Sequence, residues 1–183
     1  ARSAPVRRAG VTTSMADVGV RAHVLATTAV ARARGMPGVR GVLHLAGILD
    51  DGLLRGQTRE RFERVMRPKV LGARHLAEAL ALLPLSSVVY FSSIAGVIGS
   101  VGQGNYAAAN SWLDGFAREE QARGRLVTSV NWGGIAEVGM FAGTGAVEVS
   151  ETDLRPRDVV GVLERVVTRG VAGQVVASGW PRD

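Results

Sequence analysis

Two hydroxyl side chains occupy positions where a protein could use them for proton chemistry. Ser93 follows the apolar run at residues 88–91, and Tyr106 opens an alanine-rich segment thirteen residues after it. A phenol can donate a proton, and a serine hydroxyl can hydrogen-bond to an oxygen on which negative charge develops. Asn110 follows Tyr106 by four residues, so in a helix the two side chains lie on one face, one turn apart. The spacing indicates one site that could contain all three side chains.

Each of these residues also has a purely structural interpretation. A tyrosine at a helix start commonly lies on an amphipathic surface, and a serine at a strand end commonly caps or turns the chain. Other side chains with possible chemistry are expected to have none. His44 and His75 fall within a predicted strand and a predicted helix, where they would be packed or solvated, and Trp112 and Phe116 are expected to lie in the core.

Strands and helices alternate along the chain. The stretch at residues 92–114 predicts a loop that leads from a strand into a helix ending at Gly124. Strands that alternate with helices and are apolar on both faces favour a parallel sheet covered on both sides, so we expect a Rossmann-like, doubly wound α/β fold. The further predicted strands are residues 11–15, 39–46, 127–132 and 174–178, and the further predicted helices are residues 20–34, 59 onward and 158–169.

Two segments interrupt this regular pattern. Pro68 falls inside the helical pattern that begins at Arg59, and because proline supplies no amide hydrogen we expect a break or kink there. Residues 133–157 contain five glycines and no clear periodicity. Long structureless loops are usually functional or disordered, so this segment is predicted to form a lid.

Composition limits the class of protein. A length of 183 residues with 46% hydrophobic and 21% charged residues suits a single globular domain, expected to be soluble and cytoplasmic. No apolar run approaches the roughly 20 residues of a membrane span. The formal net charge is +6, but the basic residues are scattered and aromatic residues make up only 5%, so nucleic-acid binding is not expected. There is no cysteine, and nothing near Asp50 and Asp51 completes a metal site.

Three motifs carry a resemblance to a known family. The serine thirteen residues before a tyrosine resembles the active-site segment of short-chain dehydrogenases/reductases. More narrowly, FSSIAG (91–96), GQGNYAAAN (102–110) and NWGG (131–134) resemble the ketoreductase domains of modular polyketide synthases. This resemblance covers residues 10–180. It implies NADPH-dependent reduction of a β-ketoacyl thioester, carried on an acyl carrier protein beside neighbouring synthase domains.

The resemblance also implies catalytic roles. Tyr106 would donate a proton to the oxygen that becomes negative on hydride delivery, Ser93 would hydrogen-bond to that oxygen, and Asn110 would complete a proton relay. Most members of the wider family carry a lysine where this sequence has Asn110. Polyketide ketoreductases have the two exchanged, with the lysine in a PKV triplet that residues 68–70 match. Lys69 would then lower the phenol pKa, ordinarily about 10, and steady the cofactor ribose.

A further motif concerns the substrate. Residues 49–51 resemble the LDD motif of B-type ketoreductases, and the tryptophan typical of A-type domains, eight residues before the tyrosine, is replaced by Ile98. The resemblance implies that the thioester arm enters beside this loop and that the β-hydroxyl formed has the D configuration. The residues assigned to the substrate side are Leu49, Asp50, Asp51, Gln103 and Met140.

Cofactor contacts are implied at fewer positions than a complete nucleotide-binding domain would show. The first strand of such a domain is followed by a glycine-rich turn, and no such turn precedes Asp17. The GxGxxA match at residues 102–107 does not directly follow a strand, so it is interpreted as chance. We therefore expect a partial domain that lacks its N-terminal nucleotide-binding portion. Asp17 could equally cap a helix. The cofactor-binding assignments are Asp17, Val18, Ala46, Gly47, Lys69, Tyr106 and Gly133.

Two other functions fit the sequence. The chain could be a non-catalytic remnant that packs within a synthase and binds no cofactor. It could also be a free-standing dehydrogenase of a small alcohol, although the exchanged lysine and the LDD motif disfavour that interpretation.

Overall fold

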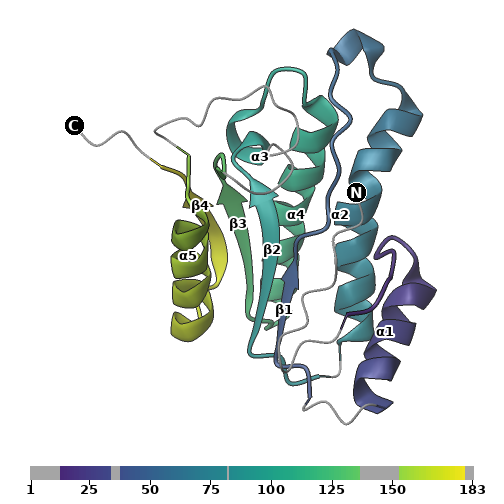
Figure 1. Ribbon diagram of the computed structural model, residues 1–183, viewed down its shortest axis with the longest axis vertical. Coiled ribbons are helices and arrows are strands. Elements are labelled where there is room, and N and C mark those ends of the chain that lie inside the picture. The colour runs from purple at the N-terminus through teal and green to yellow at the C-terminus, as the bar shows by residue number, and fades with distance from the viewer. Residues whose placement is uncertain (1–12, 34–37, 82, 137–152, 180–183) are drawn as a thin grey trace.

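The computed structural model has an α/β fold built on a four-stranded parallel sheet (Figure 1). It describes residues 13–33, 38–81, 83–136 and 153–179. Strand order follows chain order, and each neighbouring pair is parallel. The predicted fold class is therefore confirmed. The strands are β1 (Gly41–His44), β2 (Ser87–Ser93), β3 (Val127–Trp132) and β4 (Gly173–Ala177).

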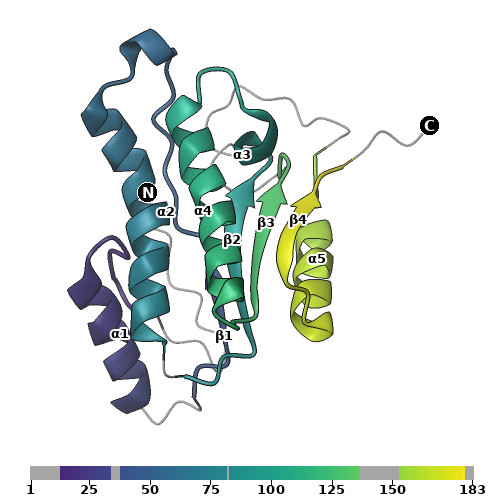
Figure 2. The ribbon, with the colours of Figure 1, turned by 180° about the vertical axis from the view of Figure 1, so that it is seen from behind.

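Helices cover both faces of the sheet (Figure 2). One face carries α2 and α4, and the opposite face carries α5, while α1 packs outside α2. A single turn, α3, which the sequence did not predict, lies between β2 and α4. The helices are α1 (Arg21–Ala33), α2 (Arg59–Ala79), α3 (Ala95–Ile98), α4 (Gly104–Ala122) and α5 (Pro156–Arg169), and residues 54–56 form one 3₁₀ turn. None of the described helices is long and apolar enough to cross a membrane.

The alternation of side chains along β2 explains why helices lie on both faces. Val88 and Tyr90 point into the core beneath α2 and α4, where they meet Leu113, whereas Val89 points into the core beneath α5, where it meets Val166. All six residues of β3 are buried for the same reason. The strand β2 accordingly reads as an apolar run at residues 88–91, whereas three of the six buried residues of β3 are polar.

The predicted strand at residues 11–15 is wrong over its described part. Residues 13–15 have no regular structure, and the Met15 side chain is fully exposed. Residues 11 and 12 lie outside the described chain. The β-branched composition of this segment favoured a strand, but strand propensity is decided by packing, and no described strand pairs with residues 13–15.

The predicted break of the second helix at Pro68 is also wrong, whereas the alternative of a kink stays a prediction. The α2 helix runs continuously from Arg59 to Ala79 with Pro68 inside it. Val65, Lys69 and Ala73 are buried along one face of this helix, on both sides of the proline. Burial of that continuous face outweighs the backbone hydrogen bond that proline cannot make.

The predicted lid at residues 133–157 falls mostly outside the described chain, since residues 137–152 are not described. Its two ends meet in a parallel bridge between Ile135 and Leu154. The remaining predicted helices and strands agree with the structure to within a few residues at each end.

Truncating Leu113 tests this account of the core. Leu113 has no solvent exposure and lies between α4 and the sheet, so Leu113→Ala should lower the free energy of unfolding by about 2–5 kcal/mol. Leu54→Ala is the matched control, because 76% of Leu54 is exposed and its loss should cost little. Urea unfolding followed by circular dichroism measures both values. Equal losses in the two variants would contradict the assignment of this core.

Candidate active site

The sheet brings the predicted site residues together at the carboxyl ends of its strands. Parallel strands all present their carboxyl ends on the same side of a sheet, where the loops that follow them meet. Ser93 is the last residue of β2, Ala46 and Gly47 follow β1, and Gly133 follows β3. The LDD loop continues from β1 at this end of the sheet. Residues that are far apart in sequence are thus gathered at one end of the molecule.

Tyr106 lies in the first turn of α4 and is almost fully buried, with 6% of the residue exposed. It packs against Val65, Ala95 and Ala109, and Leu49 from the LDD loop contacts the same cluster. Burial raises the pKa of Tyr106, the adjacent Ser93 and Asn110 side chains oppose that rise, and the negative charge of Asp51 adds to it. The phenol is therefore held in its protonated form, which is the form that can donate a proton.

Lys69 approaches Tyr106 from α2. Its Nζ lies 5.5 Å from the centroid of the Tyr106 ring and donates a hydrogen bond to the Phe91 carbonyl at 2.8 Å. Only 3% of Lys69 is exposed, and burial lowers its pKa to about 8, opposed by the charge of Asp114. The ammonium therefore lies beside the tyrosine, but the expected lowering of the Tyr106 pKa by Lys69 is not found, because burial raises that pKa.

Asn110 is fully buried one turn after Tyr106. Its Nδ2 donates to the Tyr106 carbonyl at 2.8 Å, and the Ser92 hydroxyl donates to the Asn110 carbonyl at 3.2 Å. The Asn110 Oδ1 atom has no hydrogen-bond partner within the described part of the chain. A buried acceptor of this kind can receive a hydrogen bond from a ligand or a water molecule.

A buried polar network that the sequence did not predict holds the backbone of Ser93. Asp114 on α4, 3% exposed, accepts hydrogen bonds from Ser129 and, at 2.8 Å, from the Asn131 Nδ2 atom. The same Nδ2 donates to the Ser92 hydroxyl and to the Ser93 carbonyl, both at 3.0 Å. This network connects α4, β3 and the end of β2, and it fixes the backbone that carries Ser93.

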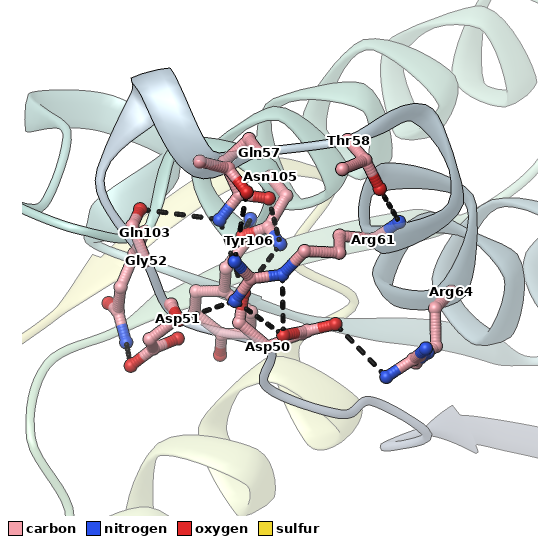
Figure 3. A network of polar contacts seen from close by, with 11 residues as sticks. Asp50, Asp51, Gly52, Gln57, Thr58, Arg61, Arg64, Gln103, Asn105 and Tyr106 are labelled. Carbon is pink, nitrogen blue, oxygen red and sulfur yellow. Dashed lines mark hydrogen bonds and ion pairs between the residues drawn. The ribbon is translucent and has the colours of Figure 1, made fainter.

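The two aspartates of the LDD loop have different surroundings (Figure 3). Asp50 forms ion pairs with Arg61 at 2.6 Å and with Arg64 at 3.2 Å, and hydrogen bonding from Arg61 lowers its pKa. Asp51 instead accepts a hydrogen bond from the Gln103 amide at 2.9 Å. Asp51 and Gln103 therefore lie together beside Tyr106, whereas Asp50 is bound within the loop's own ion pairs.

Asp17 and Val18, predicted to contact the cofactor, lie before α1 and are attached to α2. The Asp17 Oδ1 atom accepts from the Gly19 amide at 2.8 Å, and its carboxylate pairs with Arg67 at 3.3 Å. The Val18 carbonyl lies 3.0 Å from Nδ1 of His75. These contacts suit a turn that caps the start of α1, so both interpretations of Asp17 remain compatible with the structure.

Met140, the histidines and a possible metal site are the remaining features considered in the sequence. Met140 lies outside the described residues. His44 is packed, as predicted: its Nε2 lies 3.3 Å from the Lys69 carbonyl, and burial lowers its pKa to about 4, so it is uncharged near neutrality. Within the described ranges, no cluster of three or more His, Cys, Asp or Glu side chains could ligate a metal.

Comparison with known proteins identifies the relatives of this arrangement. Residues 4–137 match the family model described as "KR domain". The polyketide synthase GfsE of Streptomyces halstedii is 44% identical over 177 residues, which are 94% of this chain and 4% of that protein. This chain therefore spans a small part of the curated relatives that it matches.

Solved structures agree with this match. The ketoreductase from the first module of phoslactomycin biosynthesis in Streptomyces sp. HK803 superposes with a TM-score of 0.80 at 33% identity, over 90% of this chain and 39% of that one. A structure of A-type ketoreductases from a modular polyketide synthase gives a TM-score of 0.81 at 31% identity, over 92% of this chain and 36% of that one.

The buried ammonium of Lys69 makes stability depend on pH in a predictable direction. The pKa of Lys69 falls from 10.5 to about 8 on folding, so above pH 8 the unfolded chain binds more protons than the folded one. Relative to Lys69→Met, the wild type should gain stability by up to about 1.4 kcal/mol per pH unit between pH 8 and pH 10. Chemical denaturation at pH 7, 8.5 and 9.5 measures this difference. Because Lys69 is the only lysine, a difference that stays constant with pH would contradict the lowered pKa.

Proposed function

Because this chain belongs to the KR domains of modular polyketide synthases, we propose that it reduces a β-ketoacyl thioester to a β-hydroxyacyl thioester. The proposed hydride donor is NADPH, and the substrate is carried on an acyl carrier protein among neighbouring synthase domains. The observation that carries this proposal is the buried pair of Lys69 and Tyr106 beside the end of β2. A cation beside a protonated phenol suits proton donation to a carbonyl oxygen that becomes negative during reduction, because the cation stabilises the phenolate left behind.

The residues present fit a bound nicotinamide cofactor, which would supply the hydride. Lys69 has three N–H donors and uses one of them on the Phe91 carbonyl, so others can bind a ribose hydroxyl. The free Asn110 Oδ1 atom offers an acceptor beside the same site. Ala46, Gly47 and Gly133 would line the cofactor from the ends of β1 and β3.

Proton transfer follows from the same contacts. Tyr106 is held protonated by burial and donates its proton to the carbonyl oxygen as that oxygen becomes negative. Ser93 hydrogen-bonds to the oxygen, and the positive charge of Lys69 stabilises the phenolate that remains. A proton from solvent would then restore Tyr106, and the free Asn110 Oδ1 atom would hold, as an acceptor, the water molecule that delivers it.

We further propose a B-type domain that forms the D-configured alcohol. Support comes from the LDD loop, where Asp51 and Gln103 are hydrogen-bonded next to Tyr106 and can contact the thioester arm. Ile98, the last residue of α3, is 76% exposed at the position where the A-type tryptophan would lie.

The uncovered edge of the sheet supports a further nucleotide-binding portion. Strand β1 pairs only with β2 among the described strands, and Leu43 and Leu45 are 48% and 58% exposed beside that free edge. An open edge with apolar side chains is a surface that proteins normally cover. We propose that a parallel strand and helix of the nucleotide-binding portion cover it in the synthase.

Removing one hydroxyl tests the mechanism. Tyr106→Phe should lower the rate of β-ketoacyl thioester reduction by about 10²–10⁴-fold while folding is retained, because only the proton donor is lost. Tyr90→Phe is the matched control, since the chain's other tyrosine is buried in the core against Phe116. NADPH oxidation followed at 340 nm measures the rates in the synthase protein that contains this domain. Unchanged activity in Tyr106→Phe would refute the mechanism, and an inactive wild type would favour a non-catalytic remnant.

The configuration of the product tests the B-type assignment separately. The D-β-hydroxyacyl product should predominate, because the thioester arm enters beside the LDD loop. Chiral chromatography of the released β-hydroxy acid measures the ratio of the two enantiomers. Recovery of the L-alcohol would reject the B-type assignment and leave the reductase function standing.

A further inference from the structure

We propose that Arg61 is a positioning residue for substrate selection, because its guanidinium holds the loop at residues 50–57 against the start of α4. This inference rests on the proposed ketoreductase function and concerns a residue outside the motifs described above. Arg61 lies in the first turn of α2, and its backbone amide is capped by Thr58 at 3.4 Å.

The guanidinium of Arg61 joins both ends of the loop (Figure 3). Its Nε and Nη2 atoms donate to Oδ1 of Asp50 at 2.9 and 2.6 Å. Nη2 also donates to the Asp51 carbonyl at 2.6 Å and to the Asp50 carbonyl at 3.2 Å, and Nη1 donates to the Gly56 carbonyl at 3.1 Å. One side chain therefore binds the carboxylate at the start of the loop and backbone carbonyls at its start and its end.

The loop backbone fits closely around this guanidinium. A Cβ atom at Gly52 would lie 2.8 Å from Nη1 of Arg61, closer than real Cβ atoms approach other atoms, and 3.0 Å from Nη2. The Gly52 amide in turn donates to the Gly102 carbonyl at 2.7 Å, which connects this loop to the segment before α4. A side chain at position 52 would thus displace the guanidinium from its present position.

The contacts of Arg61 give the two aspartates different roles. Asp50, with 16% of its side chain exposed, is committed to Arg61 and Arg64. Because Arg61 also holds the Asp51 carbonyl, it fixes the backbone from which the Asp51 carboxylate reaches Gln103. Asp51 is therefore the aspartate that faces the substrate side, and its orientation depends on Arg61.

Asn105 connects the loop to the proton donor Tyr106 by hydrogen bonds. Asn105 is fully buried, and its Nδ2 donates to the Asp50 carbonyl at 2.8 Å and to Oε1 of Gln57 at 3.0 Å. Its Oδ1 accepts from the Tyr106 amide at 2.7 Å. A loop held by Arg61 is thus hydrogen-bonded directly to the turn that contains Tyr106, so the substrate side and the proton donor keep a fixed relation.

The test replaces Arg61 by lysine, which keeps the charge but cannot present a planar fork of donors to a carboxylate and several carbonyls. Arg59→Lys is the matched control on the same helix turn, because Arg59 is exposed and pairs with Glu63 alone among the described residues. Both variants are made in the synthase protein that contains this domain. The substrate is a diffusible β-ketoacyl thioester of N-acetylcysteamine.

In Arg61→Lys, we expect the KM for the thioester to rise about tenfold, because the loss of one charged hydrogen bond typically costs that much. The kcat should be nearly unchanged. The minor enantiomer of the product should increase. Hydrogen exchange at the amides of Gly52 and Gly56 should become about tenfold faster. Asp50→Asn should reproduce these changes, and the double variant should be no worse than either single one, because both remove the same contact.

The outcomes separate the two proposals. A KM, an enantiomer ratio and an exchange rate in Arg61→Lys that match Arg59→Lys would overturn the role of Arg61. A wild-type protein that does not reduce the thioester would overturn the proposed function instead, and hydrogen exchange alone would then decide whether Arg61 holds the loop. If Arg61→Lys fails to fold, Asp50→Asn and its exchange rates provide the same decision.

Discussion

The burial of one ammonium group beside one phenol constrains the rest of the site. An uncompensated charge is costly inside a protein, so the structure must supply Lys69 with polar contacts without opening the site to water. It does so with the Phe91 carbonyl, the face of the Tyr106 ring and the field of the buried Asp114 carboxylate. His44, which lies against the Lys69 carbonyl, stays neutral near pH 7 and adds no competing positive charge.

Around this pair, two polar networks fix the side chains that must meet. In the first network, Asn131 donates to the Ser93 carbonyl and is itself held by the Asp114 carboxylate. In the second network, Asn105 and Arg61 hold the LDD loop against the start of α4. A buried network with its donors and acceptors paired is rigid, and a rigid site can keep a donor aligned with a reacting oxygen.

The parts of this structure that could be predicted are those determined locally. The position of β2 follows from the apolar run at residues 88–91, and the shared face of Tyr106 and Asn110 follows from helical spacing. Local rules failed where tertiary packing decided, at the exposed residues 13–15 and at Pro68 inside α2. The partners of Asp50 could not be predicted either, because 22 basic residues are spread along the chain and the fold alone selects Arg61 and Arg64.

The placement of the lysine on α2 has a structural consequence. A cation four residues after the tyrosine would be positioned by the geometry of one helix. Here Lys69 belongs to a different helix from Tyr106, so the distance between them depends on how α2 packs against α4. That packing involves Val65 and Ala73, which are fully buried. A change in the core between these helices can therefore move the ammonium relative to the proton donor without touching either residue, which couples core packing directly to chemistry.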